Sequence, residues 1–328
     1  MFRAADVTAH AHPEWAVDWS TVDVVTDSNA LVGLMNWFRL AGSPKTVWPP
    51  NQLKLGFDIQ PTGGRAIVLK RAILDPEVIR ERETSRFGHD VRRYGIHFES
   101  VATAPAPGCE RGLDHFRVIQ YDLGGLRLVV CSEIDAYMPS EADGPLPASP
   151  LPPAHPTARL RPRLPLPSRS ADIAVVPAGT VLPQSALMEL KTEGMPTDGP
   201  PPWIHWNRTY PGLFFSQTPL LLTGGRLKDT FMFVHRRRVD SAEFRRTVAS
   251  WKHMQRGFYR LVALLRRLQK IAPVFGAGEP FTVWARRDRL ELEDLDRQAE
   301  HSLLGPEDLA RFAPTESADA CLLGIMCG

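Results

Sequence analysis

The sequence predicts a single α+β domain in which a mixed β-sheet is flanked by helices. Two apolar runs, residues 116–123 and 126–137, are joined by Gly124-Gly125, the signal of a two-residue β-hairpin turn. Residues 22–40 have the pattern of a short strand followed by a helix, and residues 241–272 that of a long amphipathic helix. We expect the long helix to pack against the sheet.

The first half of the chain supplies the elements that precede this hairpin. Asp27 or Ser28 can cap the helix that follows the strand at 22–26. A second strand is predicted at residues 65–71, directly after a glycine-rich turn. Residues 76–94 are strongly charged and predict a helix that ends near residue 94.

The second half contains a short predicted strand, a second hairpin and the long helix. The strand covers residues 186–192, and Gly224-Gly225 predicts a turn that joins 219–223 to 228–235. Residues 236–270 hold eleven lysines and arginines but only two acids. Two readings of this basic stretch stay open: a solvated helix face, or a wall that contacts phosphates.

Composition bounds the class of protein. The 328 residues are 43% hydrophobic and 23% charged, as in ordinary globular proteins. The net charge of +2 excludes a globally basic polyanion binder, so any nucleic-acid contact must be local. The first residues lack an apolar signal region, and no run reaches membrane-spanning length. We therefore expect an intracellular protein of the nucleus or cytoplasm, without membrane contact.

The chain divides into one folded region and three segments of other kinds. We expect a flexible N-terminus over residues 1–20, the α+β domain over 21–300 and a tail over 301–328. Inside the domain, residues 139–170 form a proline-rich insertion that we expect to be mobile, with ten prolines between positions 139 and 167. The insertion could recruit a protein partner that reads proline, or it could be a solvated loop.

Two pairs of charged residues carry the chemistry. Glu133 and Asp135 are two positions apart in one strand-like run, and Glu189 and Lys191 are two apart in another. Side chains two apart on a strand leave the same face of the sheet. If the two strands are neighbours, three carboxylates and one ammonium group converge. The alternative is two exposed faces with ordinary salt bridges.

Such a group of carboxylates predicts a divalent-metal site. Packed carboxylates repel one another unless a cation neutralises them, and hard oxygen ligands suit Mg²⁺ or Mn²⁺. Glu133, Asp135 and Glu189 would bind the metal, which polarises a phosphoryl oxygen and helps to deprotonate water. Lys191 would orient the nucleophile or stabilise charge on the phosphorus. These four residues are the predicted catalytic set.

The runs LVVCSEID, ending at Asp135, and LMELKT, containing Glu189 and Lys191, resemble the decapping exoribonuclease family in the order and spacing of its Asp/Glu-x-Lys nuclease core. The resemblance extends to the motif that ends at Arg71 and to the segment before Gln217. It implies a mixed-sheet nuclease-like core and a metal-dependent hydrolase that acts on RNA 5′ ends. It also implies that Arg71 contacts the RNA 5′ end and that Gln217 contacts the RNA backbone.

One position departs from the family pattern Gly-φ-x-φ-Glu, where φ is an apolar residue. Aligned at Gly88, the pattern places Arg92 where the family has its acid. A cation at this position would oppose metal binding by Coulomb repulsion. The sequence therefore leaves open a second function, a nuclease relic that has lost catalysis and binds RNA or a protein, and a third, a nuclease acting on DNA.

Overall fold

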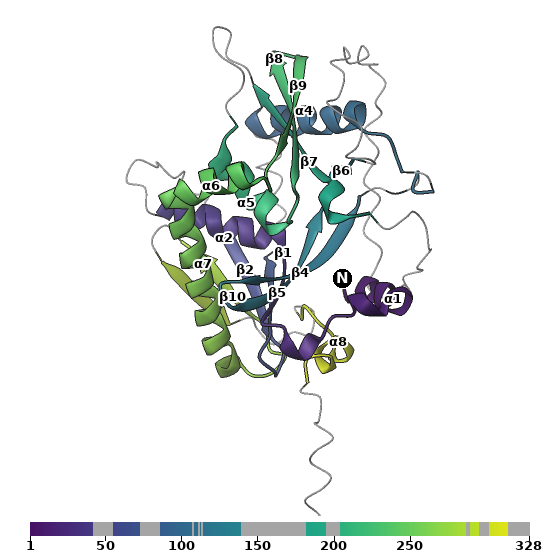
Figure 1. The fold of residues 1–328 in the computed structure, drawn as a ribbon. Helices are drawn as coiled ribbons and strands as arrows, with labels where there is room; N and C mark the ends of the chain where they lie inside the picture. Colours follow the sequence, from purple (N-terminus) through teal and green to yellow (C-terminus); the bar gives the residue numbers. More distant parts are fainter. Residues whose placement is uncertain are drawn as a thin grey trace, which may run out of the picture.

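The strands of the protein form two sheets that meet near the centre of the molecule (Figure 1). This computed structural model describes residues 1–41, 55–72, 86–106, 108–110, 112, 114–138, 182–194, 204–286, 289–294 and 302–313. The proline-rich insertion expected at 139–170 lies outside these residues. The predicted fold class, one α+β domain with a mixed-sheet core and flanking helices, is confirmed, with the core divided between the two sheets.

The larger sheet has seven strands in the order β11-β10-β2-β3-β1-β5-β4. Its centre is parallel, because β1 pairs in parallel with both β3 and β5, and the remaining pairs are antiparallel. The carboxyl ends of the three central strands therefore share one edge of the sheet. The strands are β1 (Val24–Asp27), β2 (Leu55–Pro61), β3 (Ile67–Arg71), β4 (Phe116–Leu123), β5 (Leu126–Glu133), β10 (Phe281–Ala285) and β11 (Leu290–Asp294).

The smaller sheet has the order β6-β7-β8-β9 and begins immediately after the larger one. Only Ile134 and Asp135 separate the end of β5 from the start of β6. β6 pairs with β7, and β7 runs parallel to β8, so the chain passes directly from one sheet into the other. The strands are β6 (Ala136–Tyr137), β7 (Leu187–Gly194), β8 (Leu220–Leu227) and β9 (Thr230–Arg238).

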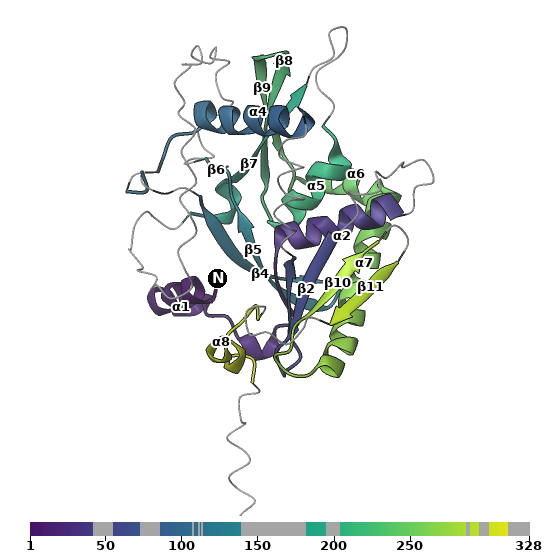
Figure 2. The same cartoon turned by 180° about the vertical axis from the view of Figure 1, so that it is seen from behind.

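Helices cover both sheets (Figure 2). α2 and α7 contribute leucines to the main core, which they share with β1, β2, β3 and β5. α4 crosses the smaller sheet and buries its Phe98 side chain there. The helices are α1 (Phe2–Ala11), α2 (Ser28–Ala41), α4 (Arg86–Ala102), α5 (Trp206–Phe215), α6 (Ala242–Ser250), α7 (Lys252–Ile271) and α8 (Pro306–Ala310). Short 3₁₀ turns lie at Pro13–Trp15, Trp19–Thr21, Gln184–Ala186 and Ala272–Phe275.

The hairpin predicted at Gly124-Gly125 is confirmed, and the one predicted at Gly224-Gly225 is wrong. Gly124 and Gly125 have φ angles of 61° and 82°, which a two-residue turn requires. Gly224 and Gly225 instead lie inside β8, and the chain reverses four residues later at Lys228. The reason is tertiary: a Cβ at Gly224 would lie 2.6 Å from the buried ring of Phe98. Glycine here makes room for an aromatic ring, not for a turn.

The single helix predicted at 241–272 is also wrong, because the chain breaks between α6 and α7 at Trp251. Trp251 has a ψ angle of 82°, outside the helical range. Its ring contacts Trp206, Tyr210 and Phe244, and these contacts hold the residue out of the helix axis. The helix predicted at 76–94 reaches Ala102, eight residues further than expected.

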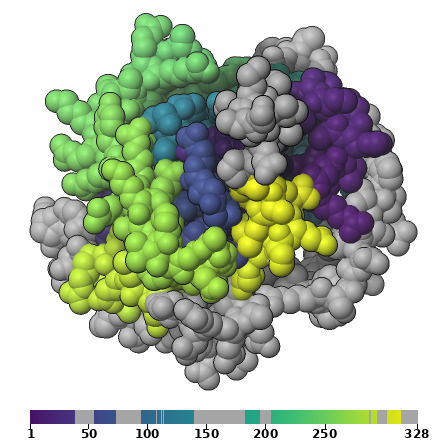
Figure 3. Space-filling model, turned by 90° about the horizontal axis from the view of Figure 1, so that it is seen from below, coloured from purple at the N-terminus to yellow at the C-terminus, as the bar shows by residue number. Residues whose placement is uncertain are grey.

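Both chain ends contribute to a small second core below the larger sheet. Residues 1–20, expected to be flexible, include α1, and the Phe2 side chain is buried beside Trp19 and Phe312. The segment expected as a tail includes α8, whose neighbour Arg311 donates two hydrogen bonds to Asp6. Figure 3 shows these C-terminal residues in yellow, close to the purple N-terminal ones. No helix among the described residues is long and apolar enough to span a membrane.

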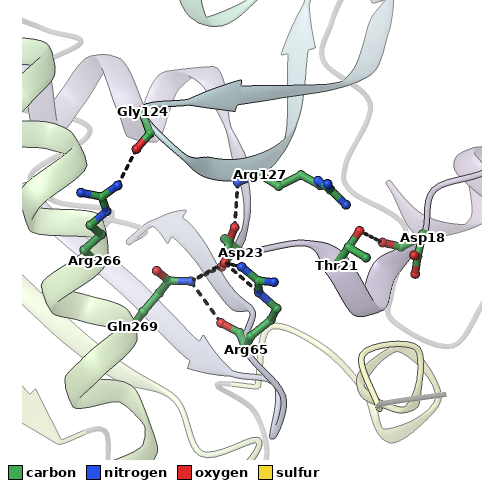
Figure 4. A network of polar contacts seen from close by, with 8 residues as sticks. All are labelled: Asp18, Thr21, Asp23, Arg65, Gly124, Arg127, Arg266 and Gln269. Atoms are coloured by element: carbon green, nitrogen blue, oxygen red, sulfur yellow. Dashed lines mark hydrogen bonds and ion pairs between the residues drawn. The ribbon is translucent and has the colours of Figure 1, made fainter. Parts of the chain in front are cut away.

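A buried carboxylate holds the amino ends of the central strands together (Figure 4). Asp23 accepts two hydrogen bonds from the Arg65 guanidinium, at 2.6 and 2.9 Å, and one from the backbone N–H of Arg127. Gln269 of α7 donates to the Asp23 carbonyl and to that of Arg65. This network fixes β1, β3, β5 and α7 at the edge opposite to the carboxyl ends of the parallel strands.

Candidate metal and phosphate site

The two predicted pairs meet where the larger sheet passes into the smaller one. Glu133 is the last residue of β5, and Asp135 lies in the connection just before β6. The pairing of Ala136 with Met188 then places this connection beside β7. Asp135 Oδ2 accepts a hydrogen bond of 2.8 Å from the backbone N–H of Leu190. The structure therefore brings the pairs together through a crossing between sheets, not through neighbouring strands of one sheet.

Glu189 and Lys191 form an ion pair on β7. The Glu189 side chain is 16% exposed and that of Lys191 44% exposed, so the carboxylate lies deeper than the ammonium group. Burial raises the pKa of Glu189 despite the opposing charge of Lys191, and the charge of Asp135 raises it further. Burial lowers the pKa of Lys191, but Glu189 and Asp135 outweigh this effect, so that its pKa is raised and the lysine stays charged.

A fourth carboxylate, which the sequence analysis missed, comes from α4. Burial raises the pKa of Glu99 to about 6, and the charge of Asp135 adds to this effect. Glu133 and Glu189 raise it as well, whereas Lys191 lowers it. The Glu99 side chain is partly exposed to solvent. Glu99 thus shares the electrostatic environment of all four predicted residues.

The local sequence explains why Glu99 was missed. Residues Gly95-Ile96-His97-Phe98-Glu99 fit the pattern Gly-φ-x-φ-Glu, complete with its acid. The alignment at Gly88, which gave Arg92 in place of the acid, is seven residues or about two helical turns too early. We therefore assign the motif to residues 95–99. The side chain of Arg92 lies outside the described part of the chain.

Phe98 explains how α4 presents Glu99. Its ring is fully buried against a cluster of apolar side chains from β7 and β8: Met188, Leu190, Leu220 and Leu222. The missing side chain at Gly224 lets the ring lie directly on the strand. A well-packed phenylalanine leaves little rotational freedom to the helix. The adjacent residue Glu99 is consequently held at one place next to β7.

The donor set suits a divalent cation. The site supplies four carboxylates, which are hard oxygen ligands. Burial raises the pKa values of Glu99 and Glu189, and repulsion from the neighbouring acids raises them further. No group of three or more His, Cys, Asp or Glu side chains within the described ranges is arranged as a complete metal-binding set. Glu189 is turned toward Lys191, and Asp135 toward the N–H of Leu190. The chemistry of the donors fits, although their side chains would have to turn.

Arg71 and Gln217, the predicted RNA-binding residues, lie on separate elements near this group. Arg71 is the last residue of β3. Thr26 of β1 pairs with Leu69 on one side and with Val130 on the other, so Arg71 lies level with Ser132, one residue before Glu133. Two strand spacings, roughly 10 Å, separate the two positions. Arg71 therefore shares the sheet edge of the carboxylates.

Gln217 lies in the turn between α5 and β8. Its φ angle is 53°, an uncommon conformation for a residue other than glycine. The turn is secured by Gln184, whose side-chain amide donates to the Gln217 carbonyl at 2.8 Å. The exposed Gln217 side chain donates to the Phe214 carbonyl. The structure thus holds this residue at the amino end of β8, beside the start of β7.

Solved structures share this fold. Rai1 of Scheffersomyces stipitis aligns with a TM-score of 0.59 and 14% identity, covering 94% of this chain and 78% of that one. Rai1 of Candida albicans, solved in complex with pU5-Mn²⁺, aligns with a TM-score of 0.55 and 12% identity, covering 94% and 80%. The S. stipitis protein in complex with (3′-NADP)⁺ and calcium ion gives 0.58 and 13%, covering 94% and 78%.

The resemblance predicted from the motifs is therefore confirmed at the level of the fold. No curated protein matches the sequence. A family model described as "Domain of unknown function (DUF8563)" matches residues 77–291, which include α4, the four predicted catalytic residues and α7. Since that match covers most of the chain, the protein belongs to the DUF8563 family.

Proposed function

We propose that the protein is a divalent-metal-dependent hydrolase of RNA 5′ ends, which cleaves a phosphodiester or a pyrophosphate-type bond. The observation that carries the proposal is the group of four carboxylates and one lysine at the crossing between the sheets. The shared fold with Rai1 structures that hold pU5-Mn²⁺ or calcium supports both the metal and the RNA. The expected location, the nucleus or the cytoplasm, is one where RNA substrates are present.

Glu99, Glu133, Asp135 and Glu189 would hold Mg²⁺ or Mn²⁺. When bound, the metal supplies a Lewis acid that polarises a phosphoryl oxygen and favours deprotonation of water. The carboxylates would fix the position of the ion relative to the protein. Because Glu189 is the more buried of the pair on β7, water screens its charge interactions less than those of Lys191.

Lys191 acts on the phosphate or on the attacking water. The surrounding acids keep its ammonium group charged, and its side chain is still 44% exposed. When a phosphate enters, the ammonium can donate to a non-bridging oxygen or orient the nucleophile. Arg71 supplies a second cation at the same sheet edge for the RNA 5′ end, and Gln217 a polar contact for the RNA backbone.

Turnover of defined RNA 5′ ends tests the proposal. RNA that is 5′-monophosphorylated, unphosphorylated or aberrantly capped is incubated with Mn²⁺, and the products are separated on gels. We expect turnover of at least one substrate by the wild type and a loss of roughly 10²-fold or more in Glu189→Gln or Glu99→Gln, the size typical for a removed electrostatic partner. Glu279→Gln, which changes an exposed acid outside the site, is the control. Lack of turnover by the wild type would contradict the proposal, and the same DNA sequences distinguish a DNA nuclease.

A second candidate is a nuclease relic that binds RNA or a protein partner without cleavage. The lack of a complete metal-binding set among the described side chains favours it. It predicts RNA binding that weakens with salt and no cleavage with any metal. Arg92→Glu separates the two functions: the assignment of the acid to Glu99 predicts that this change does not create activity. Cleavage only in the Arg92→Glu variant would support the relic and contradict the Glu99 assignment.

A further inference from the structure

An exposed phenylalanine lies beside the carboxylate group. Phe116 is the first residue of β4, and 59% of its surface is exposed. β4 is an edge strand of the larger sheet. A large apolar side chain on an edge strand loses the free energy of burial and invites unwanted pairing with other chains. Its position therefore calls for a function.

The strand register places this ring next to Glu133. Phe116 and Glu133 face each other directly in the antiparallel pair of β4 and β5. Directly opposed residues point to the same face of a sheet, and their Cβ atoms lie roughly 5 Å apart. The phenyl ring consequently stands within one side-chain length of a carboxylate that we assign to the metal site.

Packing of β4 does not depend on Phe116. The strand is held by Ile119 and Tyr121, which pack against the main core, and by Val118, which packs against the second core. Phe116 contributes to none of the buried clusters of the described residues. Its ring is thus an apolar surface that the fold itself does not use, presented at the site and directed toward solvent.

We propose that the Phe116 ring is a stacking platform for the nucleobase of the nucleotide that carries the scissile phosphate. The inference rests on the proposed function, because it takes the carboxylate group as the place where that phosphate binds. A flat aromatic ring stacks on any base, so this contact secures the nucleotide without selecting its identity. Backbone contacts from Arg71 and Gln217 and stacking on Phe116 then hold different parts of one strand.

Binding of a short oligonucleotide tests the platform separately from catalysis. The probe is a 5′-phosphorylated RNA pentanucleotide with 2-aminopurine as its first base, whose fluorescence falls when the base stacks. It is titrated into the Glu189→Gln protein, with and without Phe116→Ala, in the presence of Mn²⁺. We expect Phe116→Ala to weaken binding roughly 5- to 100-fold and to remove the quenching. Phe116→Trp should retain both.

Two controls make the result specific. Leu292→Ala removes an exposed apolar side chain from β11, the opposite edge strand of the same sheet, and should change neither affinity nor quenching. A pentanucleotide with an abasic first position should bind equally well to the proteins with and without the Phe116→Ala change. If instead Phe116→Ala leaves affinity and quenching unchanged, the platform is refuted even where the wild type cleaves RNA. Quenching by Phe116 without any cleavage by the wild type would refute the hydrolase and leave Phe116 as a stacking residue of an RNA-binding site without a scissile phosphate.

Discussion

The partial burial of Glu99, together with the charges of the neighbouring acids, makes its ionised form less favourable in the folded protein. Its pKa of about 6 lies above the ordinary value of 4.5, so the folded state disfavours its charged form. The penalty is absent below about pH 4.5, where the carboxyl is neutral in both the folded and the unfolded chain. The penalty develops as the pH rises from about 4.5 to about 6 and is fully present above that pH. At neutral pH without metal, the folded protein therefore carries an unfavourable charge at this position.

Glu99→Gln is expected to stabilise the metal-free protein at about pH 7.5 and to leave it unchanged at about pH 4.5. The gain should be about 1 kcal/mol or less, because the half-exposed carboxylate is partly screened by water. Thermal unfolding in a chelator at the two pH values measures it. Adding Mn²⁺ should stabilise the wild type more than the variant. Equal melting temperatures at the higher pH in the chelator would show that Glu99 is not under electrostatic strain.

At the same scale, the sequence pointed to four of the five residues of the proposed site and missed the fifth. Glu133, Asp135, Glu189 and Lys191 were found because an alternation of period two marks strand residues that share a face. Glu99 was missed because the helix was predicted to end near residue 94, which left position 99 outside any element. The burial of Phe98 against β7 shows that α4 continues past residue 94, and the charges of Asp135 and Glu189 act on the Glu99 carboxylate.

Among the elements, the contact between α4 and β8 controls the position of Glu99. Gly224 has no side chain, and an added Cβ would meet the Phe98 ring at 2.6 to 3.0 Å. Because Phe98 is fully buried, its ring has no room to retreat, and α4 as a whole would have to shift.

Gly224→Ala is expected to destabilise the fold by roughly 1 to 3 kcal/mol and to reduce activity by displacing Glu99. Chemical denaturation and turnover of the best RNA substrate measure the two effects. Gly212→Ala is the matched control, since a Cβ there meets nothing within 4 Å and alanine favours the helix α5. If Gly224→Ala is as stable and active as the wild type, then α4 does not depend on this contact.

The same contact explains which turns the sequence could predict. Gly124-Gly125 was recognised as a hairpin because a tight turn requires positive φ angles at these two positions, which is a local property of the sequence. Gly224-Gly225 has the same sequence, but at Gly224 glycine is required because the Phe98 ring of α4, more than a hundred residues away, packs against the strand. The break at Trp251 is of the second kind, since aromatic rings from α5 and α6 cause it. Local chemistry was predictable, and contacts across the fold were not.

Over the whole molecule, positive charge is unevenly distributed. Residues 236–270 contain 11 of the 39 basic residues but only 2 of the 37 acidic ones, so the rest of the chain is net negative. α7 has no acidic residue, and it exposes Arg256, Arg260 and Arg267 together with Tyr259. Anions are therefore attracted to one side of a nearly neutral protein.

The triple variant Arg256→Glu, Arg260→Glu, Arg267→Glu is expected to weaken binding of an RNA of about 20 nucleotides at least roughly tenfold and to flatten its salt dependence. Binding of a trinucleotide, which covers much less of the protein surface, should be weakened less. Fluorescence anisotropy over a range of salt concentrations measures both. The control variant Arg3→Glu, Arg127→Glu, Lys228→Glu changes as many exposed charges outside α7. An equal loss in both variants, or for both RNA lengths, would contradict a specific role of α7.

The two-residue joint of Ile134 and Asp135 has a consequence for how the molecule holds together. The proposed ligands come from the end of one sheet, from the first strands of the other and from a helix that covers the second. A bound ion would consequently act as a cross-link between the two sheets, in addition to the packing of Phe215 from α5 into the main core. Loss of the ion should then weaken the coupling between the sheets, which would be seen as a less cooperative unfolding transition.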